Sequence, residues 1–217
     1  MSSMKPSSVA AVIGDLVRSR AAPDRAALQG RLVAALDEVS ASVPGLLDPL
    51  AVTAGDEFQG TFATVGSALE ACLAVRLALL PHADARFGVG WGPVTLLDAQ
   101  RGIQDGPGWW AARGAIDDVH RTAATAATRT ARTAYRRAED VTGPDEAAVA
   151  AALLCRDHLL GSLDERSIEV VRGIMAGRTQ AELAQDLGIS PSAVSQRVRT
   201  DGLGVLVEAS RLLREVA

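Results

Sequence analysis

The chain has 217 residues, of which 48% are hydrophobic and 22% charged, with a formal net charge of −4 at pH 7. This length suits one large domain or two small ones, and the weak negative charge excludes a global attraction to nucleic acid or membranes, so any DNA contact must come from a local patch. Lys5 is the only lysine, which excludes a P-loop or Schiff-base lysine from the rest of the chain.

Cys72 and Cys155 are too few and too far apart for a disulfide framework, and each falls in an apolar helical run. We therefore expect two buried structural thiols in a reducing compartment. The histidines are scattered, which argues against a zinc site. Residues 2–8 lack the apolar segment of a signal peptide, and no apolar run is long enough to cross a membrane. The sequence predicts a cytoplasmic protein without membrane contact.

The first apolar run, residues 9–13, is followed by Gly14 and Asp15. This pattern predicts a buried strand that delivers a carboxylate at its C-terminal end. A helix is expected after Asp24, because apolar residues recur at helical spacing as far as Val39. Asp15 either caps the following helix or belongs to a ligand site.

Residues 50–54 predict a strand, and the turn Gly55-Asp56-Glu57 leads into a second strand that ends near Phe62. Adjacent carboxylates at a hairpin tip repel one another unless water, an arginine or a divalent metal neutralises them. We expect this tip to face Asp15 across a small α/β sheet, and a solvated turn is the alternative. A further apolar helix over 65–80 is expected to end at the following proline.

Residues 86–92 alternate large apolar residues with glycines, which predicts a strand with one bare face. Either a helix packs on that face or a ligand lies on it. A single long helix with an arginine-rich face is expected over 109–138. Residues 141–145 combine a helix stop with a new cap and mark the predicted domain boundary.

The C-terminal part predicts a helix over 147–160 and then a three-helix unit. Thr179 and Glu182 form a capping box, and Ser190 caps a last helix with proline at its first position. This unit resembles the helix-turn-helix of bacterial regulators and sigma-like modules. The motifs that carry the resemblance are TQAELA at 179–184, LGIS at 187–190 and AVSQRV at 193–198.

The last helix of this unit presents polar side chains suited to base edges and phosphates in the major groove. The predicted DNA-binding residues are Thr179, Gln180, Ser190, Ser192, Ser195, Gln196, Arg197 and Arg199. Because one such unit reads one half-site, we expect a homodimer on DNA. The alternative is a helical hairpin that packs on a protein partner.

The N-terminal part resembles the SatD family of small bacterial proteins over most of residues 9–119. The motifs are AVIGD at 11–15 with Ser19, GDEFQG at 55–60, RFGVGWG at 86–92, DGP at 105–107 and AAR at 111–113. The same motifs are more distantly similar to class III nucleotide cyclases and GGDEF domains. Those domains have a palm-like core with one acid at the end of the first strand and another in the central hairpin.

The resemblance implies that these acids hold Mg²⁺ ions on a nucleoside triphosphate. The matching metal ligands are Asp15, Asp56 and Glu57. The implied nucleotide-binding residues are Asp15, Ser19, Gly55, Asp56 and Arg113. Arg113 matches the arginine that faces the transition-state charge in cyclases. From the residues alone, an ion pair with Asp105 or Asp117 is the alternative.

Three departures from the cyclase and GGDEF patterns bear on activity. Val52 stands where cyclases have a base-selecting lysine, Trp109 stands where they have a transition-state asparagine, and Ala54 replaces the first glycine of the GGDEF tip. These departures favour a domain that binds a nucleotide or a metal over an enzyme, and no catalytic residue is assigned. The alternatives are an active metal-dependent nucleotidyl cyclase or nucleotidyltransferase, with Arg113 in a catalytic role, and a protein-interaction module.

Together these patterns predict an α+β chain with two domains. Residues 8–140 form a ferredoxin- or palm-like, nucleotide-cyclase-like sheet domain, and residues 145–217 form an all-α helix-turn-helix domain. The expected function is a bacterial transcription regulator that binds DNA and senses a nucleotide with Mg²⁺.

Overall fold

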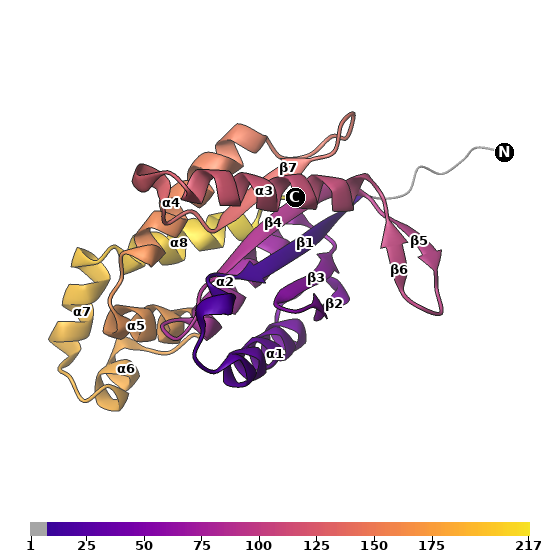
Figure 1. Ribbon diagram of the computed structural model, residues 1–217. Helices are drawn as coiled ribbons and strands as arrows, with labels where there is room; N and C mark the ends of the chain where they lie inside the picture. The colour runs from indigo at the N-terminus through magenta and orange to yellow at the C-terminus, as the bar shows by residue number, and fades with distance from the viewer. Residues whose placement is uncertain (1–7) are drawn as a thin grey trace.

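The computed structural model describes residues 8–217, and Lys5 and the polar residues 2–7 lie outside them. The described part contains a five-stranded sheet in the order β2-β3-β1-β4-β7 (Figure 1). Its strands are β1 (Ser8–Leu16), β2 (Leu46–Ala54), β3 (Glu57–Phe62), β4 (Ala85–Pro93) and β7 (Thr133–Arg137). All neighbours are antiparallel except β4 and β7, which are parallel. The predicted α+β class is confirmed.

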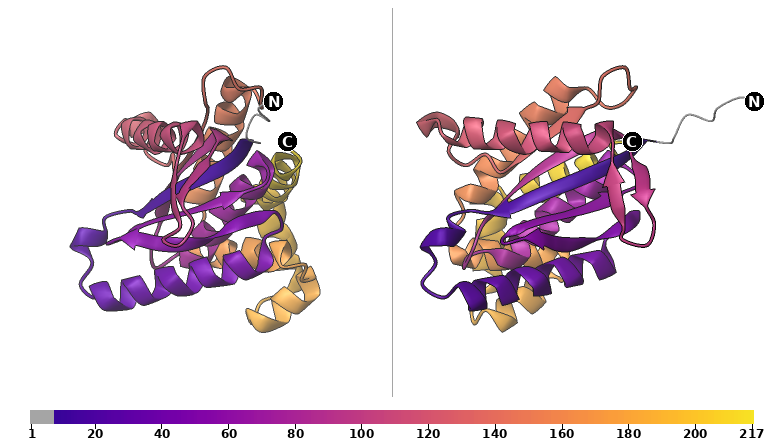
Figure 2. Two further views of the ribbon diagram at one scale, coloured as in Figure 1. Left: turned by 90° about the vertical axis from the view of Figure 1, so that its right-hand side faces the viewer. Right: turned by 45° about the vertical axis from the view of Figure 1, so that its right-hand side comes forward.

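The helices and remaining short elements follow the chain in order. The helices are α1 (Arg25–Ser42), α2 (Val65–Leu79), α3 (Pro107–Ala123), α4 (Glu146–Gly161), α5 (Glu165–Met175), α6 (Gln180–Asp186), α7 (Pro191–Thr200) and α8 (Leu203–Arg214). Two short 3₁₀ helices, η1 (Ser19–Ala21) and η2 (Ala126–Thr128), follow β1 and α3. β5 (Thr95–Asp98) and β6 (Ile103–Asp105) form a separate hairpin that extends from the end of β4 (Figure 2).

The strand β1 has two buried faces because its side chains alternate between them. Ala10 and Val12 join α1 and α2 in the main core, whereas Ala11 and Ile13 pack against α3. The sheet therefore lies between helices on both faces, and the residue that follows Ala11 and Ile13 on the α3 face is Asp15.

The bare face of β4 is filled by α3. A Cβ at Gly88 or at Gly90 would overlap with the backbone of α3 at Ala112. Of the two explanations for this glycine pattern, the structure shows helix packing. The glycines bring the helix close enough to the sheet for α3 to place its last turns beside the end of β1.

The predicted single helix over 109–138 is wrong. Helix α3 ends at Ala123, η2 follows, and residues 133–137 form β7 beside β4. The alanine content of this stretch favours a helix, but its many threonines are β-branched and stiff, and pairing with β4 overrides local propensity.

The C-terminal helices contribute to two cores. Val149 and Leu153 of α4 and Leu213 of α8 pack into the core beneath the sheet. A second core joins Leu183 of α6 and Val194 of α7 to other residues of the helical segment and to the far side of α2. The predicted boundary at 141–145 lies in the coil between β7 and α4. Helices α4 and α8, which follow it, nevertheless complete the core of the sheet.

The prediction for the two cysteines is half wrong. Cys72 of α2 is buried, but Cys155 of α4 is exposed. Helix α4 is rich in alanine and leucine on more than one face, so apolar neighbours in sequence do not identify its buried side. Over residues 8–217, no helix combines the length and apolarity needed to cross a bilayer.

Candidate functional site

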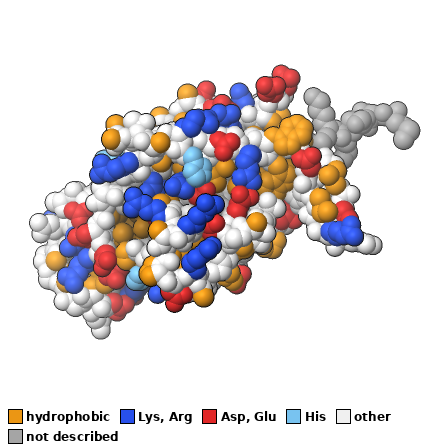
Figure 3. Space-filling view, viewed as in Figure 1, with side chains coloured by type: hydrophobic (Ala, Val, Ile, Leu, Met, Phe, Trp, Pro, Cys, Tyr) orange, Lys and Arg blue, Asp and Glu red, His pale blue; other side chains and the backbone are white. Residues whose placement is uncertain are grey.

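A hollow of about 430 Å³ opens at the C-terminal end of β1, and we call it the Asp15 hollow. It is lined by Asp15, Leu16, Arg18, Ser19, Arg20, Ala54, Asp56, Glu57, Arg86 and His120. Figure 3 shows Lys and Arg side chains gathered over the middle of the face in this view, with Asp and Glu side chains among them. The elements that meet here are the end of β1, the turn into η1, the β2–β3 tip, the start of β4 and the end of α3.

Asp15 is paired with two basic residues, Arg86 and His120. The register of the sheet places it directly opposite Arg86 on β4, and Arg86 Nη1 donates to Asp15 Oδ1 over 3.0 Å. His120 Nε2 of α3 lies 2.8 Å from Asp15 Oδ2. The carboxylate does not cap a helix, because the cap of α1 is Asp24, whose side chain accepts from the amide of Ala27.

The tip between β2 and β3 carries the other two acids. Gly55 has a positive φ of 61°, a conformation that glycine adopts at low cost. Arg113 of α3 forms a bidentate ion pair with Glu57: Nη1 donates to Oε2 over 3.1 Å and Nη2 donates to Oε1 over 2.8 Å. The hydrogen bonds that Arg113 donates to Glu57 raise the pKa of Arg113 further above its ordinary value. Asp56 is half-buried in the hollow, and no described residue forms an ion pair with it.

Arg113 therefore pairs with Glu57, and neither of the partners proposed from sequence, Asp105 and Asp117, takes that place. Asp105 instead accepts from the indole of Trp110 at 2.9 Å.

Four basic lining residues were not among the predicted site residues: Arg18, Arg20, Arg86 and His120. Arg18 has a left-handed backbone, with φ of 58°, and turns the chain out of β1. A usable signal existed for His120 alone, because it follows Arg113 by seven residues and so lies on the same face of one helix. Arg86 reaches Asp15 through strand pairing, which local sequence does not reveal.

The predicted Mg²⁺ ligands lie around one hollow but do not form one ligand set. Among residues 8–217, no three Asp, Glu, His or Cys side chains converge as a metal site. Both oxygens of Asp15 and both oxygens of Glu57 already have a hydrogen-bond partner on a basic residue. Mg²⁺ requires a near-octahedral set of oxygen ligands, and this arrangement of Asp15, Asp56 and Glu57 does not fit it.

The second candidate surface lies on α6 and α7. Both predicted caps are present: Thr179 and Glu182 form the capping box of α6, and Ser190 accepts from the amide of Ala193 at α7. Gly188 has a φ of 62° in the turn between the helices. The predicted DNA-binding side chains that are exposed here are Thr179, Gln180, Ser190, Ser192, Gln196 and Arg199, and Ser195 is partly exposed.

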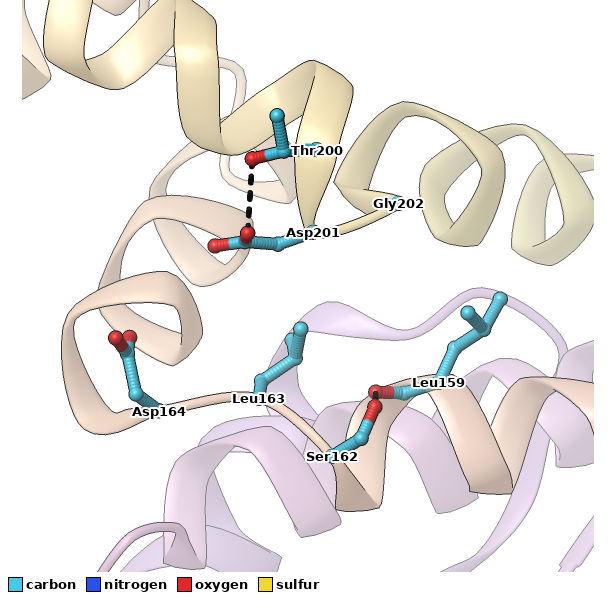
Figure 4. Close-up of a pocket in the computed structure, with 7 residues that line it drawn as sticks. All are labelled: Leu159, Ser162, Leu163, Asp164, Thr200, Asp201 and Gly202. Carbon is cyan, nitrogen blue, oxygen red and sulfur yellow. Dashed lines mark hydrogen bonds between the residues drawn. The ribbon is translucent and has the colours of Figure 1, made fainter.

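Arg197 points away from that surface. Its Nη1 lies 2.9 Å from both oxygens of Asp164 and 3.6 Å from Asp201 Oδ2. The hydrogen bond from Arg197, followed by one from the amide of Ser167, lowers the pKa of Asp164 to about 2. Figure 4 shows Asp164 and Asp201 on the two turns that border a pocket of about 380 Å³. In this arrangement Arg197 ties α7 to the start of α5.

The chain is similar to one protein family and to solved structures of known proteins. The model of the SatD family matches residues 9–215. Two solved structures described as a bacterial light-regulated adenylyl cyclase are similar, each at 13% identity. One alignment covers 61% of this chain and 44% of the other with a TM-score of 0.45, and the second covers 59% and 43% with 0.46. The chain thus spans less than half of those proteins. No curated protein matches it.

Proposed function

The chain belongs to the SatD family, and on that premise we propose that it is a bacterial transcription regulator. In this proposal α6 and α7 form a helix-turn-helix that binds DNA as a homodimer, and the Asp15 hollow binds a nucleotide-type ligand. The resemblance to palm-like domains, in which the first strand and the central hairpin carry the site, supports the second part.

The observation that carries the DNA proposal is the exposed polar face of α7. Ser192, Gln196 and Arg199 point to solvent, while Val194 is fully buried against the other helices. A recognition helix needs this division, because its apolar side must fix its angle while its polar side enters the major groove. Arg199 Nη1 donates to Ser195 Oγ over 3.2 Å, and the guanidinium forms no ion pair with a described residue.

The charge of this surface predicts how it would bind. Residues 179–200 carry two acids and two arginines, and Arg197 is occupied by Asp164. Phosphate attraction is therefore weak, and affinity must depend on hydrogen bonds to base edges. We infer a sequence-specific binder with low non-specific affinity.

The test starts from a library of random DNA duplexes, because the operator sequence is unknown. Duplexes enriched by the protein are measured by fluorescence anisotropy, with scrambled duplexes as controls. Arg199→Ala should weaken binding and reduce its salt dependence by about one unit, and Gln196→Ala should relax specificity by about 1–3 kcal/mol at one base pair. Arg101→Ala, on the β5–β6 turn, is the matched control. No enrichment, or unchanged affinity in both folded variants, would favour the protein-interaction module instead.

The ligand proposal is tested by a thermal-shift screen of nucleoside triphosphates and cyclic nucleotides, with and without Mg²⁺. A ligand at about 100 times its Kd should stabilise the protein by about 2.7 kcal/mol. Asp15→Ala should reduce this shift, because it releases Arg86 and His120 from their positions. The Mg²⁺ predicted from the resemblance is tested by the same screen. DNA affinity measured with and without the best ligand then tests whether the hollow acts as a sensor.

The geometry gives less support to a nucleotidyl cyclase. Val52 is packed against the core beneath the sheet, and the indole of Trp109 donates to Gln104 over 3.3 Å. Neither side chain supplies the polar group that cyclases have at the matching position. Arg113 is held by Glu57, so ligand binding is favoured over turnover.

A further inference from the structure

We propose that the Asp15 hollow binds the phosphate groups of its ligand directly through arginines, without a bridging divalent metal. The ligand class is a di- or triphosphate ester. This inference rests on the proposed nucleotide binding and names the chemistry by which it occurs.

The first argument is the charge around the hollow. Arg18, Arg20 and Arg86 line it together with three acidic residues, and Arg113 reaches Glu57 from α3. Four arginines therefore stand against three carboxylates, without any charge on His120. A two-metal site has the opposite character, because its acids outnumber its cationic side chains until the metals arrive.

The second argument is the state of the acids. A metal ion would have to displace Arg86 and His120 from Asp15, which they contact over 3.0 Å and 2.8 Å. It would also have to break the two-armed pair between Arg113 and Glu57. Two-armed pairs of this kind combine charge with a fixed geometry and are among the stronger polar contacts in proteins. Only Asp56 remains free to bind a metal.

The third argument is the state of the cationic groups. Arg18 and Arg20 are exposed at the rim of the hollow, and neither forms an ion pair with a described residue. Arg86 Nε is buried and has no hydrogen-bond partner in the described part of the chain. A guanidinium fork is matched to two phosphate oxygens. The hollow thus offers unused donors for phosphate, and its volume of about 430 Å³ lies in the range of small-molecule sites.

The experiment uses inorganic tripolyphosphate as the probe, with calorimetry in EDTA and again in excess Mg²⁺. We expect binding in EDTA, and at least a tenfold loss in the double variant Arg18→Ala, Arg20→Ala. Both side chains are exposed, so this variant should fold, and circular dichroism checks that it does. Arg101→Ala removes another exposed arginine, on the β5–β6 turn away from the hollow, and should bind like the wild type.

Asp56→Asn separates the two modes by the sign of its effect. If arginines bind phosphate directly, removing this carboxylate removes a repulsion and tightens binding several-fold. If Mg²⁺ bridges, the same change removes a ligand and weakens binding. Binding that requires Mg²⁺ and is lost in Asp56→Asn overturns the inference but leaves nucleotide binding intact. Failure of tripolyphosphate and of every nucleotide in both buffers overturns the inference and the ligand proposal, while DNA binding is judged separately.

Discussion

Arg76 of α2 and Asp157 of α4 form an ion pair in the interior of the protein. Arg76 Nη1 lies 3.1 Å from Asp157 Oδ1, and the two side chains are 2% and 1% exposed. Asp157 Oδ2 also accepts from the amides of Arg132 at 2.7 Å and Thr133 at 2.6 Å. One carboxylate thus fixes α4 to α2 and to the start of β7, and the C-terminal helices are anchored to the sheet through buried charge.

We predict that Asp157→Ala lowers the free energy of unfolding by about 3–5 kcal/mol, because it leaves two backbone amides buried without an acceptor and removes one of the two carboxylates that pair with the buried Arg76. Urea unfolding followed by circular dichroism measures this change. Asp98→Ala breaks an exposed pair with Arg101 and should cost at most about 1 kcal/mol. Similar costs in both variants would contradict a buried role for Asp157.

A second contact joins α8 to the sheet part of the chain. Gly66 N in the first turn of α2 donates to the carbonyl oxygen of Val216 over 2.8 Å, and a Cβ at Gly66 would overlap with the carbonyl of Arg214. Gly66→Ala should therefore destabilise the protein by about 1–3 kcal/mol. Gly30→Ala is the matched control, because Gly30 lies in α1 with nothing within 4 Å of its added Cβ.

Gly30→Ala should stabilise the protein by about 0.5–1 kcal/mol through the lower entropy of the unfolded chain. Opposite signs for the two substitutions, measured by urea unfolding, would show that the end of α8 packs against α2. If Gly66→Ala is also stabilising, that packing is absent in solution.

The sequence predicts the parts of this molecule that depend on local chemistry. The apolar run before Asp15 and the glycine at the β2–β3 tip specify two strands, and their pairing through Gly14 and Phe58 brings the acids to one end of the sheet. The caps at Thr179 and Ser190 are likewise local and are found where expected.

What the sequence does not reveal is set by contacts between distant segments. Arg86 reaches Asp15 across strands 71 residues apart, and His120 reaches it from 105 residues away. Neither pairing leaves a periodic pattern. The composition of residues 124–138 suggests a helix, and pairing with the open edge of β4 makes residues 133–137 a strand. The inward direction of Arg197 depends on Asp164, which precedes a different helix.

The pair between Arg197 and Asp164 predicts a pH dependence. The pKa of Asp164 falls from 3.8 to about 2 in the folded state, first because of the hydrogen bond from Arg197. A lowered folded-state pKa stabilises the protein above pH 4, and this contribution is lost as the pH falls toward 2. The free energy of unfolding should therefore fall more steeply over this range in the wild type than in Asp164→Asn, which keeps a good helix cap.

Asp164 is largely exposed, so solvent screening keeps the effect small. Arg197→Ala should reduce the fall in the free energy of unfolding between about pH 4 and pH 2 in the same way, because it removes the main cause of the lowered pKa of Asp164. Glu165→Gln changes a neighbouring acid outside this pair and should leave that fall unchanged. Parallel curves for all four proteins would show that the pair does not form in solution.

The two cysteines should differ sharply in reactivity. Burial raises the pKa of the Cys72 thiol to about 12, and the thiolate is the form that reacts, whereas Cys155 is exposed on α4. In native protein, iodoacetamide at pH 8 should modify one thiol within minutes, and peptide mass spectrometry should place the label on Cys155. Cys155→Ser should abolish the fast reaction and Cys72→Ser should leave it unchanged. In urea both thiols should react at similar rates, so two fast thiols without denaturant would mean that α2 is not packed beneath the sheet.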